Sequence, residues 1–331
     1  MGEFELLDRI RARLPRPGPQ VRLGSGDDAA ITVPGGATAT SVDALVDGVH
    51  FRREWSSLRQ IGSKALAVAL SDLAAMGAPA GEAYVVLGIP ADLDEDGCVE
   101  LLDGIAEVAE ETGTTLAGGD VTRAPVLTLA MTVVGHAPDP QNLVTRAGAQ
   151  SGDALVLTGE LGGAAAGLLL LEDEARSPFV ALSATNGERM HPLISRQLEP
   201  RPRLDAGRGL AAAGATAMID LSDGLGGDAG HLARASAVGL RIDGDALPIE
   251  GGVTEVAMSA GRDPLELATS GGEDYELLAT LPAARLAEAT AGLETQGTKL
   301  TRIGAVVAGE GVEIRLPDGG LLEPRGFDQL G

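Results

Sequence analysis

Asp220-Leu221-Ser222-Asp223-Gly224 is the stretch that decides the local fold. It follows apolar residues 217–219, which predict a short strand, and it precedes helical spacing over residues 224–237. An acidic turn between a strand and a helix sets carboxylates beside outward-pointing backbone N–H groups, which suits a phosphate or its metal ion. Ser222 or Asp223 can equally act as a plain helix N-cap, and capping is compatible with ligation.

Five more short clusters along the chain combine an acidic residue with Gly or Ser. Carboxylates that repel one another gather around a cation, and Mg²⁺ takes carboxylate oxygens together with nucleotide phosphates. The set predicts a Mg-dependent enzyme that handles phosphate groups. The clusters are Gly24-Ser25-Gly26-Asp27-Asp28, Ser41-Val42-Asp43, Ser71-Asp72, Gly118-Gly119-Asp120 and Gly271-Gly272-Glu273-Asp274.

Two of these clusters differ in what they indicate. Asp72 lies in a predicted helix over residues 58–76 that is apolar almost all round, where desolvation disfavours an uncompensated carboxylate. A metal ion or a charged hydrogen bond would compensate the carboxylate. The alternative is that Asp72 lies on a single solvent-exposed stripe of the helix. Gly118 and Gly119 follow a strand predicted over residues 114–117, so their N–H groups can approach phosphate while Asp120 holds a metal. An ordinary turn explains the same residues equally well.

The composition excludes several classes of protein. A formal net charge of −23 argues against nucleic-acid and anionic-membrane partners, since both need clustered Lys and Arg. Cys98 is the only cysteine, so the chain contains no internal disulfide and no multi-Cys metal site. The N-terminus lacks a basic-then-apolar signal, and no stretch is long and apolar enough to span a bilayer. We therefore expect a cytoplasmic protein.

The predicted elements give an α+β protein of two domains. In the first part, strands over residues 37–42, 83–89, 114–117 and 126–136 alternate with helices over 58–76 and 94–112, after an opening helix over 3–13. In the second part, strands over 154–158, 217–219, 240–243, 275–280 and 301–307 accompany helices over 164–172, 203–213 and 224–237. Each sheet is expected to carry its helices on one side. The polar, Pro- and Gly-rich segment 138–153 predicts the seam, which gives domains 1–145 and 146–331.

In this order, the clusters resemble the thiamine-monophosphate kinase family, part of the superfamily that includes aminoimidazole ribonucleotide synthetase. The resemblance covers nearly the whole chain. It rests on Gly-Asp-Asp-Ala-Ala (26–30), Gly-Val-His-Phe (48–51), the stretch 64–78, Asp-Leu-Ser-Asp-Gly-Leu (220–225) and Ser-Gly-Gly-Glu-Asp-Tyr-Glu-Leu (270–277). No P-loop, His-Arg-Asp or Asp-Phe-Gly motif occurs, so neither familiar phosphotransfer scaffold applies.

The resemblance implies that ATP phosphorylates thiamine monophosphate to thiamine diphosphate. It implies a homodimer whose N-terminal mixed sheets pair into a shared β-barrel, with a C-terminal α/β sandwich domain. It carries catalytic roles onto Asp28, Asp72, Asp120 and Asp220. Several Mg²⁺ ions are implied at Asp28, Ser41, Val42, Asp43, Asp72, Asp120, Asp220 and Asp223. ATP contacts carry onto Gly119, Asp120, Arg146 and Ser222, and substrate contacts onto His50, Glu273 and Phe327.

Two departures from the family pattern matter. Val42 stands where relatives have Thr, so a metal bond there must use its carbonyl oxygen. The helix over residues 94–112 lacks an aromatic residue that might stack on adenine, which leaves base recognition unassigned. Trp55 is a second candidate partner for the thiazolium cation, with a plain loop anchor as the equal alternative.

The chemistry also fits the residues independently of the resemblance. A phosphate monoester with a second pKa of about 6 is already anionic at neutral pH and needs no strong general base. The obstacle is repulsion between two anions, which metal ions held by carboxylates relieve. A cyclo-ligase of the same superfamily and a non-catalytic dimer that binds Mg-nucleotide remain the alternatives.

Overall fold

The computed structural model describes Arg9 and residues 12–14, 16–24, 29–172, 191–316 and 318–327. The chain divides into two compact units. One comprises Met1–Leu73 and Ala78–Asn142, and the other comprises Ala74–Gly77 and Leu143–Gly331. The helix expected over residues 3–13 falls largely outside the described residues, and Asp28 also lies outside them.

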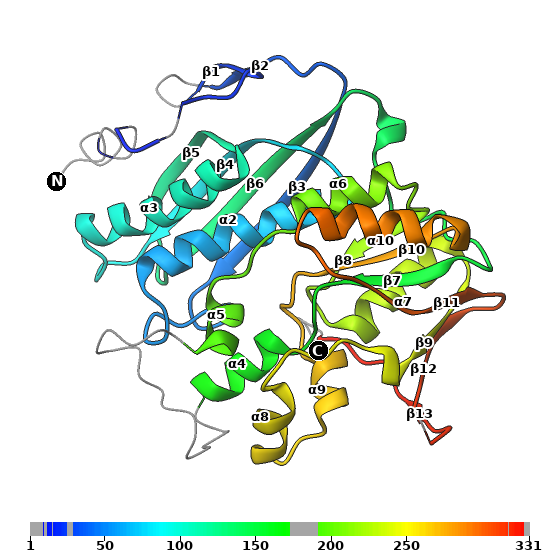
Figure 1. Ribbon diagram of the computed structural model, residues 1–331. Coiled ribbons are helices and arrows are strands. Elements are labelled where there is room, and N and C mark those ends of the chain that lie inside the picture. Colours follow the sequence, from blue (N-terminus) through cyan, green and yellow to red (C-terminus); the bar gives the residue numbers. More distant parts are fainter. Residues whose placement is uncertain are drawn as a thin grey trace. The chain divides into compact units, whose positions relative to one another are not determined.

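The first unit is built on a four-stranded sheet with the order β3-β6-β4-β5 (Figure 1). β3 (Ala37–Val46) and β6 (Thr128–Ala137) are antiparallel, as are β6 and β4 (Ala80–Ile89), whereas β4 and β5 (Thr115–Arg123) are parallel. A separate short ladder joins β1 (Val21–Leu23) and β2 (Ile31–Thr32), and a 3₁₀ turn follows at η1 (Pro140–Asn142). The strands predicted in this part are all present.

Helices α2 (Leu58–Ala75) and α3 (Glu95–Thr112) lie across one face of this sheet (Figure 1). Their backbones meet closely at two glycines. A Cβ on Gly62 would lie 1.8 Å from the carbonyl oxygen of Leu101, and one on Gly104 would lie 1.9 Å from that of Arg59. Asp94 caps the start of α3 by accepting the N–H of Gly97. The predicted helices are therefore confirmed, and small residues set their spacing.

β5 is longer than predicted. The strand expected over residues 114–117 continues to Arg123 because its backbone stays paired with β4 through Ile89. Gly118, Gly119 and Asp120 therefore lie inside the strand, and their interpretation as a turn after it is wrong. A Cβ on Gly119 would lie 2.1 Å from the carbonyl oxygen of Val85, so this close approach of backbones requires glycine.

The second unit contains a seven-stranded sheet with the order β13-β12-β9-β11-β7-β10-β8. Most of its pairs are antiparallel, and β12 and β9 are parallel. The strands are β7 (Ala154–Thr158), β8 (Ala217–Asp220), β9 (Gly239–Asp243), β10 (Leu277–Leu281), β11 (Leu300–Val307), β12 (Gly311–Arg315) and β13 (Leu321–Leu322).

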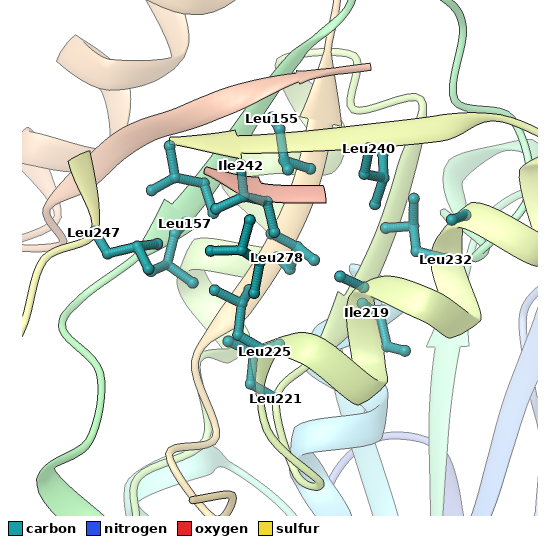
Figure 2. Close-up of a cluster of buried hydrophobic side chains, with 14 of the residues drawn as sticks. Leu155, Leu157, Ile219, Leu221, Leu225, Leu232, Leu240, Ile242, Leu247 and Leu278 are labelled. Atoms are coloured by element: carbon teal, nitrogen blue, oxygen red, sulfur yellow. The ribbon is translucent and has the colours of Figure 1, made fainter. Parts of the chain in front are cut away.

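Both faces of this sheet are covered by helices. Every position of β7, β8 and β10 is buried, which shows that neither face is open to solvent there. Figure 2 shows the core on the side of α7 (Leu225–Ser236), where Leu225 and Leu232 pack with Leu157, Ile242 and other strand side chains. The expectation of helices on one side is therefore wrong for this sheet. α6 (Leu204–Ala212) contacts β10, and α10 (Leu286–Thr295) contacts β11.

A second core of this unit lies among short helices. These are α4 (Gly163–Leu171), α5 (Pro192–Leu198), α8 (Val253–Ser259) and α9 (Pro264–Ser270), with 3₁₀ turns at η2 (Gly244–Ala246) and η3 (Ala283–Arg285). The architecture is α+β, as predicted. Within the described ranges, no helix is both long and apolar enough to cross a membrane.

Candidate active site

In the first unit, β3 and α2 bring three of the predicted ligands together. The hydroxyl of Ser41 donates a hydrogen bond to the carboxylate of Asp72. Asp43 lies two residues further along β3 and therefore on the same face as Ser41. Burial raises the pKa of Asp43, and the negative charge of Asp72 adds to this, while the N–H of Ala44 donates to the carboxylate at 3.0 Å and opposes it. These groups are hard oxygen donors of the kind Mg²⁺ takes.

Val42 lies between them and faces the opposite way. Val42 is 68% exposed, and because its neighbour Ser41 contacts Asp72 on α2, Val42 lies on the sheet face opposite that helix. A metal bond at Val42 would have to use its main-chain carbonyl oxygen, which is the restriction expected from the sequence.

Asp120 is not brought to Asp43 and Asp72. In the register of the sheet, one row joins Asp43 through Met131 and Val85 to Gly119. The next row contains Asp120, on the other face of the sheet. β3 and β5 are also the two outer strands, about 14 Å apart across three strand spacings. Within one chain, Asp120 therefore cannot share an ion with Asp43 and Asp72.

His50 lies in the tight turn that follows β3. Its Nδ1 accepts the N–H of Val46 at 3.1 Å, which leaves Nε2 directed away from that bond. An open pocket beside the turn is lined by Asp47, Gly48, Arg52, Arg53 and Glu54. The guanidinium of Arg52 lies 4.4 Å from the ring centre of Trp55, so that ring already has a cation partner. This contact favours the loop-anchor interpretation of Trp55.

In the second unit, the two acidic loops lie side by side. The N–H of Glu273 donates to the carbonyl oxygen of Ser222 at 2.8 Å, and the N–H of Tyr275 donates to that of Leu221 at 2.9 Å. Asp220 ends β8 and is 4% exposed. Residues predicted for nucleotide and for substrate, Ser222 and Glu273, are thus joined through their main chains.

Gly224, with φ +104°, is the N-cap of α7, and no side chain caps this helix. The interpretation of Ser222 or Asp223 as a simple N-cap is therefore wrong. Asp228, in the first turn of α7, folds back to accept the N–H of Asp223 at 3.1 Å. Burial, and then the charges of Asp220 and Asp223, raise the pKa of Asp228 to about 8. Sequence reasoning missed Asp228, although an acid just inside a helix that begins with Gly was a usable signal.

The loop after α9 has an unusual backbone. Gly272, Glu273 and Tyr275 have φ values of +70°, +59° and +50°, and left-handed conformations are unfavourable for side-chain-bearing residues. The amide of Gln197 on α5 donates to the carboxylate of Glu273. Asp274 accepts the N–H of Gly162 at the start of α4.

A buried ion network fixes the end of this loop. Glu276 is fully buried and accepts hydrogen bonds from Thr158 at 2.7 Å, Arg203 at 2.9 Å and Arg196 at 3.1 Å. Arg196 also lies 2.9 Å from Glu250. Breaking such a network leaves a charge buried without compensation. We infer that these contacts hold the strained loop in place.

Phe327 is positioned by the main chain of the acidic loop. Its N–H donates to the carbonyl oxygen of Asp223 at 2.8 Å, and its side chain is 66% exposed. The segment before it crosses the first turn of α7, where a Cβ on Gly226 would lie 2.4 Å from the carbonyl oxygen of Arg325. Arg146 is exposed, beside the start of β8, since the carbonyl oxygen of Thr145 accepts the N–H of Met218 at 3.0 Å.

Within the part of the chain that the structure describes, no three His, Cys, Asp or Glu side chains assemble into a metal site. Asp28, the remaining predicted ligand, is not among those residues. The two units contribute separate parts of the predicted ligand set, with Asp43 and Asp72 in one and Asp220 and Asp223 in the other.

Comparison of the chain with known proteins identifies its family. Residues 26–137 match the model for the AIR synthase related protein, N-terminal domain, and residues 150–317 match that for the C-terminal domain. Thiamine-monophosphate kinase of Escherichia coli K12 is 38% identical over 312 residues, which are 93% of this chain and 91% of that protein. The chain belongs to the thiamine-monophosphate kinase family.

Solved structures of thiamine-monophosphate kinases have the same fold. The enzyme from Stenotrophomonas maltophilia K279a has a TM-score of 0.83 and 38% identity, covering 97% of this chain and 98% of its own. AaThiL complexed with AMPPCP and TMP has a TM-score of 0.76 and 32% identity, covering 98% of this chain and 96% of its own. Membership of the thiamine-monophosphate kinase family predicted from the sequence is confirmed.

Proposed function

We propose that this protein transfers the γ-phosphoryl group of ATP to thiamine monophosphate, which yields thiamine diphosphate and ADP in the last step of thiamine diphosphate biosynthesis. The observation that carries the proposal is the hydrogen bond from the N–H of Glu273 to the carbonyl oxygen of Ser222. It joins the loop assigned to ATP with the loop assigned to the substrate. A family member holding AMPPCP and TMP supports the same pair of ligands.

The residues suit a direct transfer between two phosphates. The acceptor oxygen of thiamine monophosphate is anionic near neutral pH, so no residue has to remove a proton from it. Glu273 offers a carboxylate to the cationic thiazolium, and Gln197 holds that carboxylate in place. Phe327 presents an exposed aromatic side chain close to the same loop, which suits a cationic ring.

We propose that several Mg²⁺ ions bind at Asp28, Ser41, Asp43, Asp72, Asp120, Asp220 and Asp223, with the carbonyl of Val42. The donor set fits, since it consists of carboxylate, hydroxyl and carbonyl oxygens. Asp72 is half-buried on α2 and its charge acts on Asp43, so a cation between the two carboxylates would offset their repulsion. Bound Mg²⁺ would neutralise the charge of both phosphate groups during in-line transfer. The carboxylates would hold the ions, and Gly119, Arg146 and Ser222 would contact ATP.

We also propose that the protein is a homodimer whose first-unit sheets pair into a shared barrel. The face of the sheet opposite α2 and α3 exposes Val42 and Val86, at 68% and 44%, beside Ala44 and Ala130. A contiguous apolar face of this kind suits a subunit contact. In such a dimer, Asp120 at the β5 edge serves the site of the partner subunit, because it is too far from Asp43 and Asp72 of its own subunit. The cytoplasmic location expected from the sequence stays a prediction.

The decisive experiment incubates the purified protein with ATP, Mg²⁺ and thiamine monophosphate, and measures thiamine diphosphate. Thiamine and substrates of the aminoimidazole pathway form the control panel. Diphosphate formed only from the monophosphate supports the proposal. Product from an aminoimidazole substrate would replace it with a cyclo-ligase function, and nucleotide binding without any product would favour a non-catalytic dimer.

A further inference from the structure

Arg146 lies in a short segment whose main chain is held by one side chain from a distant helix. The hydroxyl of Ser236, the last residue of α7, donates to the carbonyl oxygen of Arg146 at 2.9 Å. The same hydroxyl accepts the N–H groups of Gly148 and Ala149, each at 3.1 Å. A serine hydroxyl offers one donor and two acceptor positions, and all three are used here.

The segment has little freedom to adopt another conformation. The carbonyl oxygen of Thr145 accepts the N–H of Met218 on β8 at 3.0 Å. Gly148 has φ +128°, and a Cβ on it would lie 2.4 Å from the carbonyl oxygen of Thr216. Arg146 is therefore held from β8 on one side and from Ser236 on the other, while its own side chain is exposed.

The main chain of Arg146 is also set back from Asp220, the acid at the end of β8. It lies level with the start of β8, three residues before Asp220, a distance of about 10 Å along a strand. A side chain that starts from this position suits a contact with the bound nucleotide rather than with the phosphoryl group during transfer. Weakening it should therefore change nucleotide affinity more than kcat.

We propose that Ser236 is a positioning residue, which acts on nucleotide binding by fixing the main chain of Arg146. This inference rests on the nucleotide contact proposed for Arg146. Ser236 touches no reacting atom, and its effect is transmitted through Arg146 alone. A helix that begins at the acidic loop and ends at Ser236 thus supports both ends of the nucleotide site in the second unit.

The test measures AMPPCP binding with Mg²⁺ by calorimetry for Ser236→Ala, Arg146→Ala and the double variant, together with kcat and both KM values. Ser236→Ala removes the three hydrogen bonds that fix this segment, and it is expected to weaken AMPPCP binding about fivefold, with kcat and the KM for thiamine monophosphate unchanged. The double variant is expected to bind like Arg146→Ala, because Ser236 has nothing left to position. Ser236→Thr, which keeps the hydroxyl, is expected to restore binding.

Ser259→Ala is the matched control. Ser259 likewise ends a helix of the same unit, and its hydroxyl donates only to the carbonyl oxygen of Val256. We expect it to bind AMPPCP like the unaltered protein.

The proposal would be overturned if the losses of AMPPCP affinity in the two single variants multiplied in the double variant. Normal AMPPCP binding by Ser236→Ala or by Arg146→Ala would also overturn it. A Thr variant that folds normally but binds as weakly as the Ala variant would also overturn it. If the unaltered protein forms no thiamine diphosphate, the proposed function fails, while the AMPPCP measurements still decide the role of Ser236.

Discussion

The hydroxyl of Ser41 on β3 donates a hydrogen bond to the carboxylate of Asp72 on α2. Two residues that lie far apart in the sequence, both predicted as metal ligands, are thus in direct contact. Asp43 is close enough for the charge of Asp72 to raise its pKa. A pair of carboxylates and a hydroxyl on the helix-covered side of the sheet form the centre of the proposed metal site in the first unit.

Asp72→Asn should abolish turnover while the protein still folds. The amide keeps the size of the side chain and an oxygen that accepts the Ser41 hydrogen bond, but it removes the charge that holds a cation. We expect kcat to fall on the order of 100-fold or more, with the melting temperature little changed. Asp139→Asn, an exposed acid of the same unit, is the control. Unchanged turnover would remove Asp72 from the metal site.

Mixing inactive variants tests whether Asp120 serves the partner subunit. Asp72→Asn and Asp120→Asn should each be inactive, yet a mixed dimer has one site with both substitutions and one intact site. With random exchange of subunits at equal amounts, the mixture should recover about one quarter of the unaltered activity. It should also regain Mg-AMPPCP binding in calorimetry. The control mixes Asp72→Asn with Asp43→Asn. These two residues serve the same site from the same subunit, so every site in the mixture lacks one of them and the mixture should stay inactive. A mixture of the first two that stays inactive would place Asp120 elsewhere.

Glu273→Gln should weaken binding of thiamine monophosphate. The substitution keeps the shape and the contact with Gln197, but it removes the negative charge offered to the thiazolium. We expect the KM for thiamine monophosphate to rise about tenfold, which corresponds to about 1.4 kcal/mol. The KM for ATP should not change. Glu255→Gln, on the surface of α8, is the control. An effect confined to the KM for ATP would contradict the assignment.

Asp274 should make stability depend on pH. Burial raises the pKa of Asp274 from 3.8 to about 7, against the opposing effects of the N–H of Gly162 and the charge of Arg196, with Glu276 also nearby. Because the folded protein then binds the proton more tightly than the unfolded chain, this contribution is fully present below pH 3.8 and is lost as pH rises to about 7.

The measurement compares the unaltered protein with Asp274→Asn, whose amide oxygen still accepts a hydrogen bond from Gly162. Urea unfolding between about pH 4 and pH 7 should show the free energy of unfolding falling more steeply with pH in the unaltered protein. Equal slopes would mean that the N–H groups around Asp274 outweigh its burial.

The sequence predicted elements with strong periodicity and missed those defined by tertiary contacts. α2, α3 and α7 have clear apolar patterns, and all three were predicted. The seven-residue helices α5, α8 and α9 were not, because so short a segment takes its stability from packing rather than from its own pattern. The extension of β5 was missed for a similar reason, since Gly118 and Gly119 signal a turn until pairing with β4 is known.

The sequence predicted the acidic residues of the site but not the residues that contact them and hold them in place. Asp220, Ser222 and Glu273 were singled out by their Gly and Ser neighbours. Gln197, which contacts Glu273, is separated from it by 76 residues, and Arg203 is 73 residues from Glu276. Nothing in a local pattern connects such pairs, because only the fold brings them together.

The left-handed backbone at Glu273 and Tyr275 lowers the stability of the loop that carries a proposed substrate-binding side chain. Each such residue costs on the order of 1 kcal/mol relative to a relaxed backbone, and glycine would remove that cost. At position 273, however, glycine would delete the carboxylate meant for the substrate and its contact with Gln197. Backbone strain at position 273 is therefore tied to the side chain that is proposed to contact the substrate, and one cannot be removed by glycine without the other.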